Sequence, residues 1–276
     1  MLEKFIFENH LGQRFDGFEH GVYLNYNDLR DYSWSYETLN SRISRFYHSV
    51  TKRKLPLVIN GRSDEEAVKI KNRLHDLAEV DIYARIPGRI YVGDYYTNGF
   101  ITGSAKSQYL ITKRYCNIDL ELTSEDPTWY REKTYPFLAE GDGASNNIGG
   151  ADYPYDYPYD YGLSVKGEQI NCDSLGDGAF RIIIYGEVTN PSIIIGGHVY
   201  AVNGSVGAGE TLVIDGLNKT ITLTKSSGEK INWFDHRGRE HYIFEPIPNG
   251  VSSVSWSGSF GFDLTVIEKR SEPKWI

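Results

Sequence analysis

Cysteine and methionine are scarce in this sequence, which has two cysteines and one methionine in 276 residues. Cys116 and Cys172 stand far apart in strand-like stretches, so the chain has neither a disulfide framework nor a CxxC metal-binding motif. We therefore expect two free thiols. No segment approaches the roughly 18 consecutive apolar residues of a membrane span, and the first residues lack the apolar run of a signal peptide. We expect a protein that is made in a cytoplasm and is not inserted in a membrane.

An excess of positive charge is also missing. The chain has 29 lysines and arginines against 37 aspartates and glutamates, which gives a net charge of -8. Because such a chain repels phosphate backbones, we expect no specific nucleic-acid partner. The only tight basic cluster, residues 52–54, is interpreted as a solvated strand end or a contact with an acidic neighbouring subunit.

Aromatic residues, by contrast, are abundant. They make up 14% of the chain, led by 21 tyrosines, while hydrophobic residues make up 40%. This composition is typical of a folded protein rich in β-structure and contact surfaces. The length of the chain suits two domains of ordinary size.

The first half of the chain combines strand-like runs with one helix. Ser63 followed by Glu66 fits a capping box, and apolar residues recur at helical spacing from Ala67 to Ala78, which predicts a helix over residues 64–78. The helix is expected to cover one side of a sheet. The expected strands lie at residues 22–26, 42–47, 80–84, 89–92 and, as the longest, 108–123. The first half is therefore predicted to be an α+β domain.

The second half has no helical segment. Alternating apolar and polar residues, separated by turns, predict strands at residues 179–188, 192–202, 211–215, 220–224, 229–232, 241–244, 250–256 and 261–268. Since no helix is available to cover a sheet, two sheets have to cover each other. The whole chain is thus predicted to be mainly β, with an α+β domain followed by an antiparallel β-sandwich.

A tract rich in Tyr, Pro and Asp at residues 153–161 separates the two halves. Its prolines exclude a helix or a regular strand. The tract fits either an extended connection laid over a domain surface or a sticky arm for a neighbouring subunit. The predicted organisation is an N-terminal domain over residues 1–135, a linker over residues 136–162 and a C-terminal domain over residues 163–276.

Candidate catalytic groups all have simpler structural interpretations. Five carboxylates of the second half stand mostly beside turns, where they serve solubility and capping rather than glycoside hydrolysis: Glu187, Glu210, Asp215, Glu229 and Asp235. The charges of residues 235–241 fit a solvated hairpin tip better than a metal site. Residues 204–207 are interpreted as a loop because they lack the spacing of a nucleophile elbow, and the glycines of residues 141–150 lack the helix of a phosphate-binding loop. We expect no catalytic residue, no cofactor and no metal ligand.

Several stretches of the sequence are similar to one known protein family. Residues 186–195 (GEVTNPSIII), 209–215 (GETLVID) and 219–223 (KTITL) follow a pattern of its C-terminal half, and residues 126–130 (DPTWY) follow a pattern that closes its first domain. The ending RSEPKWI, residues 270–276, follows the family's R-x-x-P-x-W-L/I. The chain resembles the siphovirus distal tail proteins, a Dit-like family of phage tail components.

The resemblance implies a non-enzymatic structural protein of a phage tail tip or baseplate, encoded by a phage or a prophage. Its N-terminal domain would close into a ring of six copies, and its C-terminal sandwich would be similar to a galectin or a carbohydrate-binding module. The implied partners are further copies of the chain, the tail tube protein above, and a tail-associated lysin, tail fibre or receptor-binding protein below. The protein would be assembled in the bacterial host cytoplasm and reside at the virion tail tip.

Two alternatives remain at this stage. A carbohydrate-binding adhesin could use Trp233 and Trp256 as stacking platforms for a host cell-surface saccharide, although an inward-facing core position is favoured for Trp256. A glycan-cleaving enzyme would need a pair of the carboxylates above.

The large apolar residues Trp275 and Ile276 stand at the end of the sequence, where chains usually fray. We expect them to be anchored in a groove, against the first domain.

Overall fold

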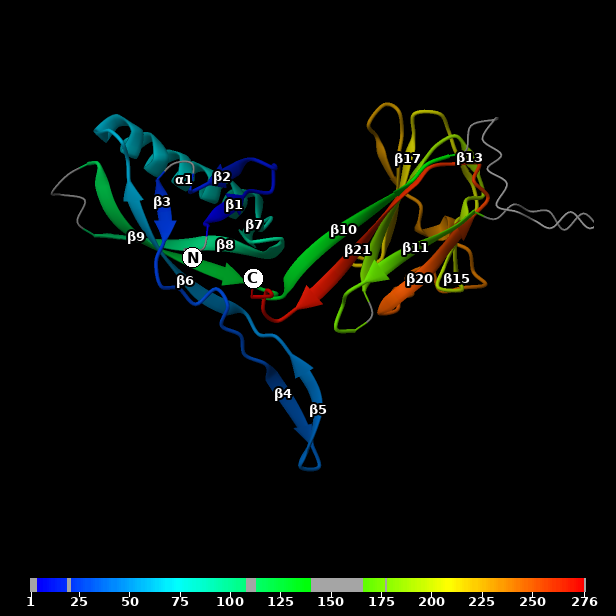
Figure 1. Ribbon diagram of the computed structural model, residues 1–276, viewed down its shortest axis with the longest axis horizontal. Helices are drawn as coiled ribbons and strands as arrows, with labels where there is room; N and C mark the ends of the chain where they lie inside the picture. Colours follow the sequence, from blue (N-terminus) through cyan, green and yellow to red (C-terminus); the bar gives the residue numbers. More distant parts are fainter. Residues whose placement is uncertain (1–3, 19–20, 108–112, 140–165, 177, 276) are drawn as a thin grey trace, which may run out of the picture. The chain divides into compact units, whose positions relative to one another are not determined.

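The computed structural model of the protein describes residues 4–18, 21–107, 113–139, 166–176 and 178–275 (Figure 1). The chain forms two compact units: unit 1 comprises residues 1–131 and 269–276, and unit 2 comprises residues 132–268. The chain passes between them within strands β10 (Trp129–Phe137) and β21 (Phe262–Arg270). The final residues therefore lie with unit 1, whereas the sequence analysis placed them in the second domain.

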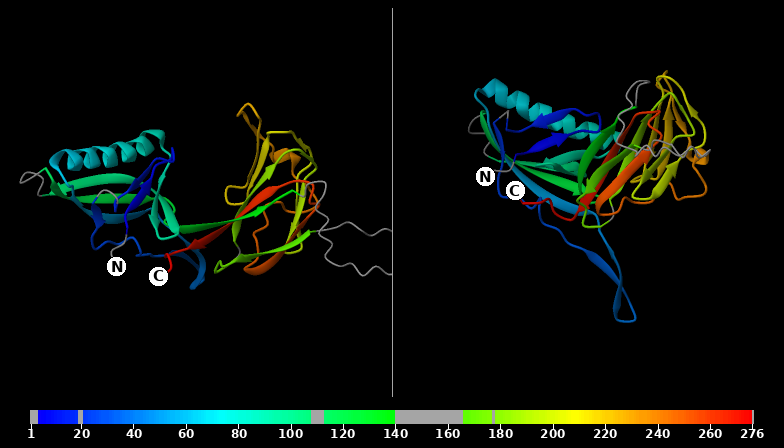
Figure 2. Two further views of the ribbon diagram at one scale, coloured as in Figure 1. Left: turned by 45° about the horizontal axis from the view of Figure 1, so that its top comes forward. Right: turned by 45° about the vertical axis from the view of Figure 1, so that its right-hand side comes forward.

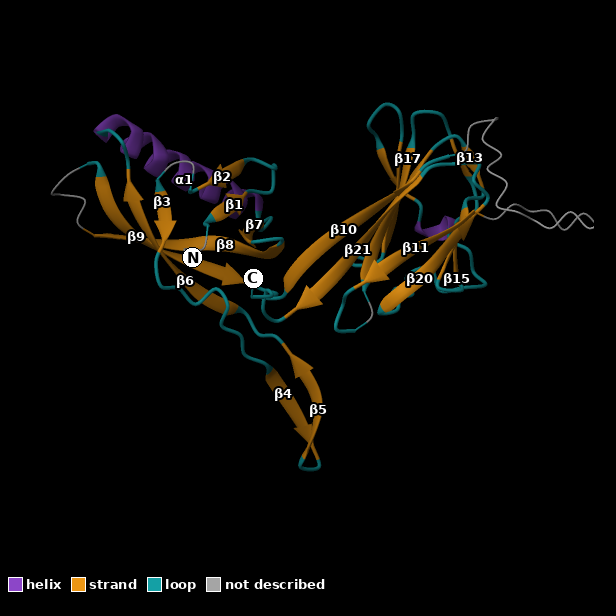
Figure 3. Ribbon diagram, in the orientation of Figure 1, coloured by secondary structure: helices purple, strands orange, loops and turns teal. Residues whose placement is uncertain are grey.

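The fold is mainly β, as predicted (Figure 3). The other strands of unit 1 are β1 (Ile6–Glu8), β2 (Arg14–Asp16), β3 (Val22–Leu24), β4 (Ser35–Leu39), β5 (Arg42–Tyr47), β6 (Thr51–Asn60), β7 (Gly88–Val92), β8 (Tyr95–Ser107) and β9 (Tyr115–Ser124). β4 and β5 pair with each other, and the remaining strands are hydrogen-bonded in the orders β2-β1-β7-β8 and β3-β6-β9-β8. Helix α1 (Asp64–Ala84) lies across one face of these strands (Figure 2). Among the described residues, no helix is both long and apolar enough to span a bilayer.

Helix α1 begins where the capping signal predicts. Ser63 Oγ accepts a hydrogen bond from the Glu66 backbone N–H at 3.2 Å, and the Glu66 carboxylate accepts one from the Arg62 N–H at 2.7 Å. The buried face of the helix contains the predicted residues Ala67, Ile70, Leu74, Leu77 and Ala78. The predicted packing of one helical face against the sheet is therefore confirmed.

The predicted strand at residues 80–84 is wrong, because these residues form the last turns of α1. Asp81 lies on the buried face, one turn beyond Leu77 and Ala78. Arg85 then ends the helix in the left-handed conformation, with φ of 56°. Its backbone N–H donates hydrogen bonds to the Asp81 and Ile82 carbonyls. Short apolar runs fit strand and helix equally well, so the pattern alone could not show that the helix continues.

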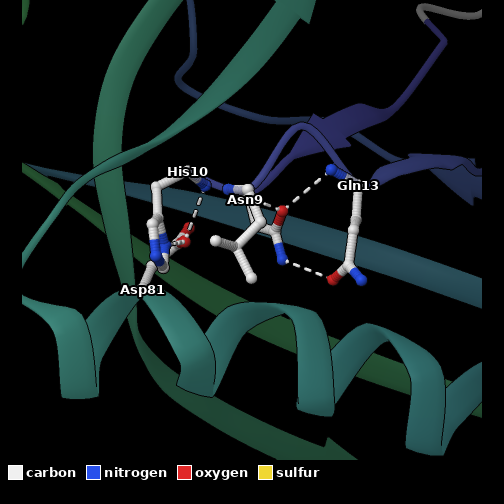
Figure 4. A network of polar contacts seen from close by, with 5 residues as sticks. Asn9, His10, Gln13 and Asp81 are labelled. Carbon is white, nitrogen blue, oxygen red and sulfur yellow. Dashed lines mark hydrogen bonds and ion pairs between the residues drawn. The ribbon is translucent and has the colours of Figure 1, made fainter. Parts of the chain in front are cut away.

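The end of α1 is tied to the turn between β1 and β2 by a buried carboxylate (Figure 4). Asp81 Oδ1 accepts a hydrogen bond from the His10 backbone N–H at 2.9 Å and lies 2.6 Å from His10 Nδ1. In the same turn, Asn9 Oδ1 accepts hydrogen bonds from the N–H groups of Leu11 and Gln13. Asp81 is only 1% exposed, and a Cβ atom on Gly88 would collide with its Oδ2. The carboxylate therefore joins α1 to the turn between β1 and β2 and packs closely against Gly88.

Replacing Asp81 with Ala should lower the free energy of unfolding by about 1–3 kcal/mol, because His10 would lose its buried partner. Urea denaturation measures the change. Asp76→Ala is the matched control, since it removes an exposed carboxylate from the same helix. Equal effects of the two substitutions would contradict the structural role of Asp81.

The longest predicted strand differs from the structure in its limits. β9 begins at Tyr115, and residues 108–112 lie outside the described residues. Its buried face is as predicted and contains Cys116, Ile118, Leu120 and Leu122. The sequence analysis missed β8, which is 13 residues long, because Gly99 and Gly103 interrupt its alternation. Gly99 is required by close packing, since a Cβ there would lie 2.6 Å from Ser124 Oγ.

The basic cluster at residues 52–54 is not simply a solvated strand end. Lys52 pairs with Glu121 at 2.8 Å, but Arg53 points into the core of unit 1 and is 2% exposed. Its guanidinium lies 5.8 Å from the Trp129 ring, and Nη2 donates to the Pro127 carbonyl at 3.2 Å. Burial lowers the pKa of Arg53, against the opposing effect of Asp28 and Asp31. Through these contacts with Pro127 and Trp129, Arg53 stabilises the turn that leads into β10.

Asp126 organises the same turn. Its Oδ1 accepts hydrogen bonds from the Thr128 N–H and hydroxyl, and its Oδ2 accepts one from the Tyr130 hydroxyl at 2.6 Å. Burial alone would raise the pKa of the Asp126 carboxyl, but these hydrogen bonds outweigh burial and lower it. The Asp-Pro-Thr-Trp-Tyr stretch is therefore a structural corner rather than a reactive site.

The lowered pKa of Asp126 predicts a loss of stability in acid. The carboxyl contributes fully above its unfolded-state pKa of about 3.9, and the contribution is lost as the pH falls through the lower folded-state pKa. Urea unfolding between pH 5 and pH 2 should therefore show a steeper loss for the wild type than for Asp126→Asn. The difference will be small because Asp126 remains partly in contact with solvent, which weakens its electrostatic contribution. Parallel curves would contradict this assignment.

Unit 2 is an antiparallel β-sandwich. Its further strands are β11 (Lys166–Cys172), β12 (Ala179–Tyr185), β13 (Val188–Thr189), β14 (Ser192–Ile195), β15 (His198–Ala201), β16 (Ser205–Val206), β17 (Thr211–Asp215), β18 (Thr220–Thr224), β19 (Lys230–Asn232) and β20 (Gly250–Trp256). The two sheets have the orders β19-β18-β17-β12-β21-β10 and β11-β20-β14-β15. Side chains of both sheets share one core, which includes Phe180, Ile193, Leu212 and Trp256. Both cysteines are buried and free, as predicted.

Several local predictions for unit 2 are wrong. The single strand expected over residues 192–202 is a hairpin of β14 and β15. Residues 241–244 form turns instead of a strand, although Ile243 and Phe244 are buried. The turns are held by hydrogen bonds from the Tyr200 hydroxyl to the Glu245 carbonyl and between His198 Nε2 and the Tyr242 carbonyl. Residues 205–206, expected in a loop, form strand β16, which pairs with β13.

Candidate self-association surface

Strands β4 and β5 form a hairpin that projects from the rest of unit 1 (Figure 2). Leu39 pairs with Arg42, so the connecting loop is the two residues Asn40 and Ser41. Both have positive φ, 50° and 59°, as a type I′ turn requires. The sequence analysis predicted a strand over 42–47 but not its exposure on every side.

The hairpin and its flanking residues carry many apolar side chains on a free surface. Those that are exposed include Tyr32, Trp34, Tyr36, Leu39, Ile43, Phe46, Tyr47 and Val50. Leu39 is 67% exposed and Phe46 is 58% exposed, so neither contributes to the core of unit 1. Within the described residues, β4 and β5 pair only with each other. Isolated hairpins are marginally stable in water, and contiguous exposed apolar surface usually marks an interaction site.

A second feature of unit 1 is an open strand edge. From Phe100 to Ser107, β8 pairs with β9 on one side. On its other side, the pairing with β7 stops at Gly99. Most residues of β8 beyond Ile101 are exposed, and no strand in the described part of the chain covers this edge. An exposed edge of this length offers unpaired backbone groups to another chain.

A cleft of about 270 Å³ lies beside this edge, between α1 and strands β8 and β9. Its apolar lining includes Leu74, Ala78, Ile82, Ile101 and Leu120. Lys71, His75 and Glu79 stand among its polar lining residues, and the His75–Glu79 pair, 3.3 Å apart, is largely exposed. The cleft therefore resembles a contact surface more than a reaction site.

Of the five carboxylates considered for catalysis, Glu210 and Asp215 are engaged in local structure, while Glu187, Glu229 and Asp235 are exposed. Glu210 pairs with Lys225 at 2.9 Å, and this contact and the Gly207 N–H lower the pKa of Glu210. Asp215 accepts hydrogen bonds from the Leu217 and Asn218 N–H groups in the turn after β17. Asp235 is 99% exposed. In the described residues, no group of three or more metal-ligating side chains is suitable for holding an ion.

The charged stretch at residues 235–241 is not a hairpin tip. It begins in a 3₁₀ turn, Phe234–His236, whose His236 ring stacks on Trp233 with centroids 4.4 Å apart. The Trp233 ring is partly buried against the core, while Trp256 is 3% exposed and its Nε1 donates to the Phe260 carbonyl. The core position favoured for Trp256 is confirmed, so this ring offers no open stacking platform to a saccharide.

No family model matches the sequence, and no curated protein matches it. Comparison of folds gives clear matches. The Dit protein of phage SPP1, described as a paradigm of the hub adsorption apparatus in phages infecting Gram-positive bacteria, matches with a TM-score of 0.53 at 10% identity, over 96% of this chain and 99% of that one.

Chains from two structures of the phage P2 baseplate in its activated conformation, with Ca and with Sr, match with TM-scores of 0.59 and 0.60. Each match has 13% identity and covers 99% of this chain and 100% of the other. The chain therefore has, over nearly its whole length, the fold of Dit and baseplate proteins of phage tails.

Proposed function

We propose that the chain is a structural protein of a phage tail tip, a distal tail protein that joins the tail tube to the adsorption machinery. The observation that carries this proposal is the whole-chain fold likeness to the SPP1 Dit protein, whose structure is described as a hub. The likeness extends over both units instead of one common sandwich. A shared sandwich alone would say little, because such folds host many functions.

Self-association into a closed ring, of six copies in our proposal, is supported by unit 1. The exposed hairpin and the open β8 edge are different surfaces, so a contact between them on neighbouring copies would be heterologous. Heterologous contacts generate closed rings when the rotation between copies closes. The ring would bind the tail tube protein on one side and a tail-associated lysin, tail fibre or receptor-binding protein on the other.

A non-catalytic role fits the chemistry of the described residues. Asp215 takes part in a turn and Glu210 in an ion pair, and the cleft beside α1 is lined by apolar and exposed charged side chains. We therefore propose that the protein acts through its surfaces, without a cofactor or a metal ion. Its expected location is the distal end of the virion tail, after assembly in the bacterial cytoplasm.

Immunogold electron microscopy of tailed particles from a lysate that contains this protein tests the proposal. Gold should gather at the distal end of the tail and be absent from particles made without the protein. Labelling of the capsid, or of the tail along its full length, would overturn a tail-tip role.

A further inference from the structure

The segment over residues 271–275 lies against the loop that leads into the β4–β5 hairpin. Arg30 Nη1 donates a hydrogen bond to the Pro273 carbonyl at 3.0 Å, and Trp34 Nε1 donates one to Ser271 Oγ at 3.2 Å. Pro273 is buried, which shows that the segment is packed and does not only touch the surface. Both contacts lie within unit 1.

The anchoring residue differs from the one that the sequence suggested. Trp275 is 76% exposed instead of inserted in a groove, and Ile276 lies outside the described residues. The Arg30 guanidinium lies 4.2 Å from the centre of the Trp275 ring, and Trp275 Nε1 donates to Glu272 Oε1 at 2.6 Å. Trp275 therefore covers Arg30, while Pro273 supplies the buried contact.

Trp34 connects this segment to both ends of the hairpin. It immediately precedes β4, and its ring stacks on His48, just beyond β5, with centroids 3.8 Å apart. The edge of the Trp34 ring meets Phe46 of β5, at 6.4 Å between centroids. Any contact that fixes Trp34 therefore restrains both strands where the hairpin leaves the rest of unit 1.

We infer that residues 271–275 act as a clasp that sets the direction of the hairpin and so controls self-association. The inference rests on the proposed ring, in which the hairpin binds a second copy of this chain. A hairpin held in one direction before binding loses less conformational freedom on association than a hairpin that swings freely. Removing the clasp should therefore weaken self-association although every apolar residue of the hairpin remains.

The test compares the full chain with a variant that stops after Arg270, by hydrogen–deuterium exchange at a dilution where both are monomeric. Exchange in residues 35–47 should become roughly tenfold faster in the truncated chain, while β6 and β9 remain protected. Sedimentation at higher concentration should show a dissociation constant raised roughly tenfold. Lys274→Ala, an exposed residue of the same segment, should leave both results unchanged.

Unchanged exchange in the hairpin would overturn the clasp, whatever the oligomeric state. Faster hairpin exchange in a chain that never self-associates would support the clasp and overturn the ring on which its control of self-association depends. If truncation also exposes β6 and β9, Trp34→Phe takes its place, because it removes the hydrogen bond to Ser271 and keeps an aromatic ring. That variant should speed exchange in the hairpin alone, and protection equal to wild type would overturn the inference.

Discussion

Replacing Leu39 and Ile43 at the tip of the hairpin with serine should raise the dissociation constant for self-association at least about 100-fold. A few central residues of an interface can contribute about 2 kcal/mol or more each, and a factor of ten corresponds to about 1.4 kcal/mol. Sedimentation equilibrium over a concentration series measures the change. Both side chains are more than half exposed. Each substitution should therefore change the free energy of unfolding by no more than about 0.5 kcal/mol, as surface substitutions usually do.

Leu175→Ser is the matched control for the hairpin variant. Leu175 is 75% exposed, compared with 67% for Leu39, but it belongs to unit 2. It should leave self-association unchanged. Equal weakening by the two leucine substitutions would mean that apolar surface in general, and not the hairpin, drives association.

Trp129→Ala should destabilise unit 1 by about 3–5 kcal/mol, the usual cost of removing a large aromatic side chain from a core. Trp129 is 0% exposed and packs near Arg53, so the substitution also leaves that buried cation without its aromatic neighbour. Trp256→Ala is the counterpart in unit 2, where Trp256 packs edge-on against Phe137 and Phe262. We expect each substitution to lower the unfolding midpoint of its own unit.

Calorimetry of the two variants also tests whether the two domains that we propose, residues 1–135 and 163–276, fold independently. Two transitions, each shifted by only one substitution, would support it. A single transition shifted equally by both would show that the units unfold together. The physical basis of such coupling would be β10 and β21, which both pass from one unit into the other.

The features that could be predicted from the sequence are those set by local chemistry and one-sided burial. Ser63 and Glu66 place the start of α1, because a capping box depends only on neighbouring residues. Alternation in β12 and β21 places apolar side chains on the inner face of the sandwich. Elements of this kind can be predicted from their own residues alone.

Features that depend on contacts between distant segments could not be predicted. Arg53 sits in an exposed-looking basic cluster, yet it is buried because Pro127 and Asp31 provide carbonyl partners. The end of α1 depends on His10, 71 positions earlier in the sequence than Asp81. No local sequence pattern indicates either contact.

The candidate self-association surface could not be predicted from the sequence for a different reason. We interpreted β5, with Ile43, Phe46 and Tyr47 among polar residues, as a strand with one exposed face, and the sequence does not show that neither face is covered. Asn40-Ser41 between two alternating runs is a usable hairpin signal, since Asn tolerates positive φ. It would have identified the hairpin but not its exposure.

Single-particle electron microscopy of the purified full-length chain, over a series of increasing concentrations, tests the account most directly. The account predicts closed rings of six copies, lost in the Leu39→Ser, Ile43→Ser variant and kept in Leu175→Ser. Two-fold dimers, open filaments, or single copies at every concentration and after addition of the tail tube protein would contradict it.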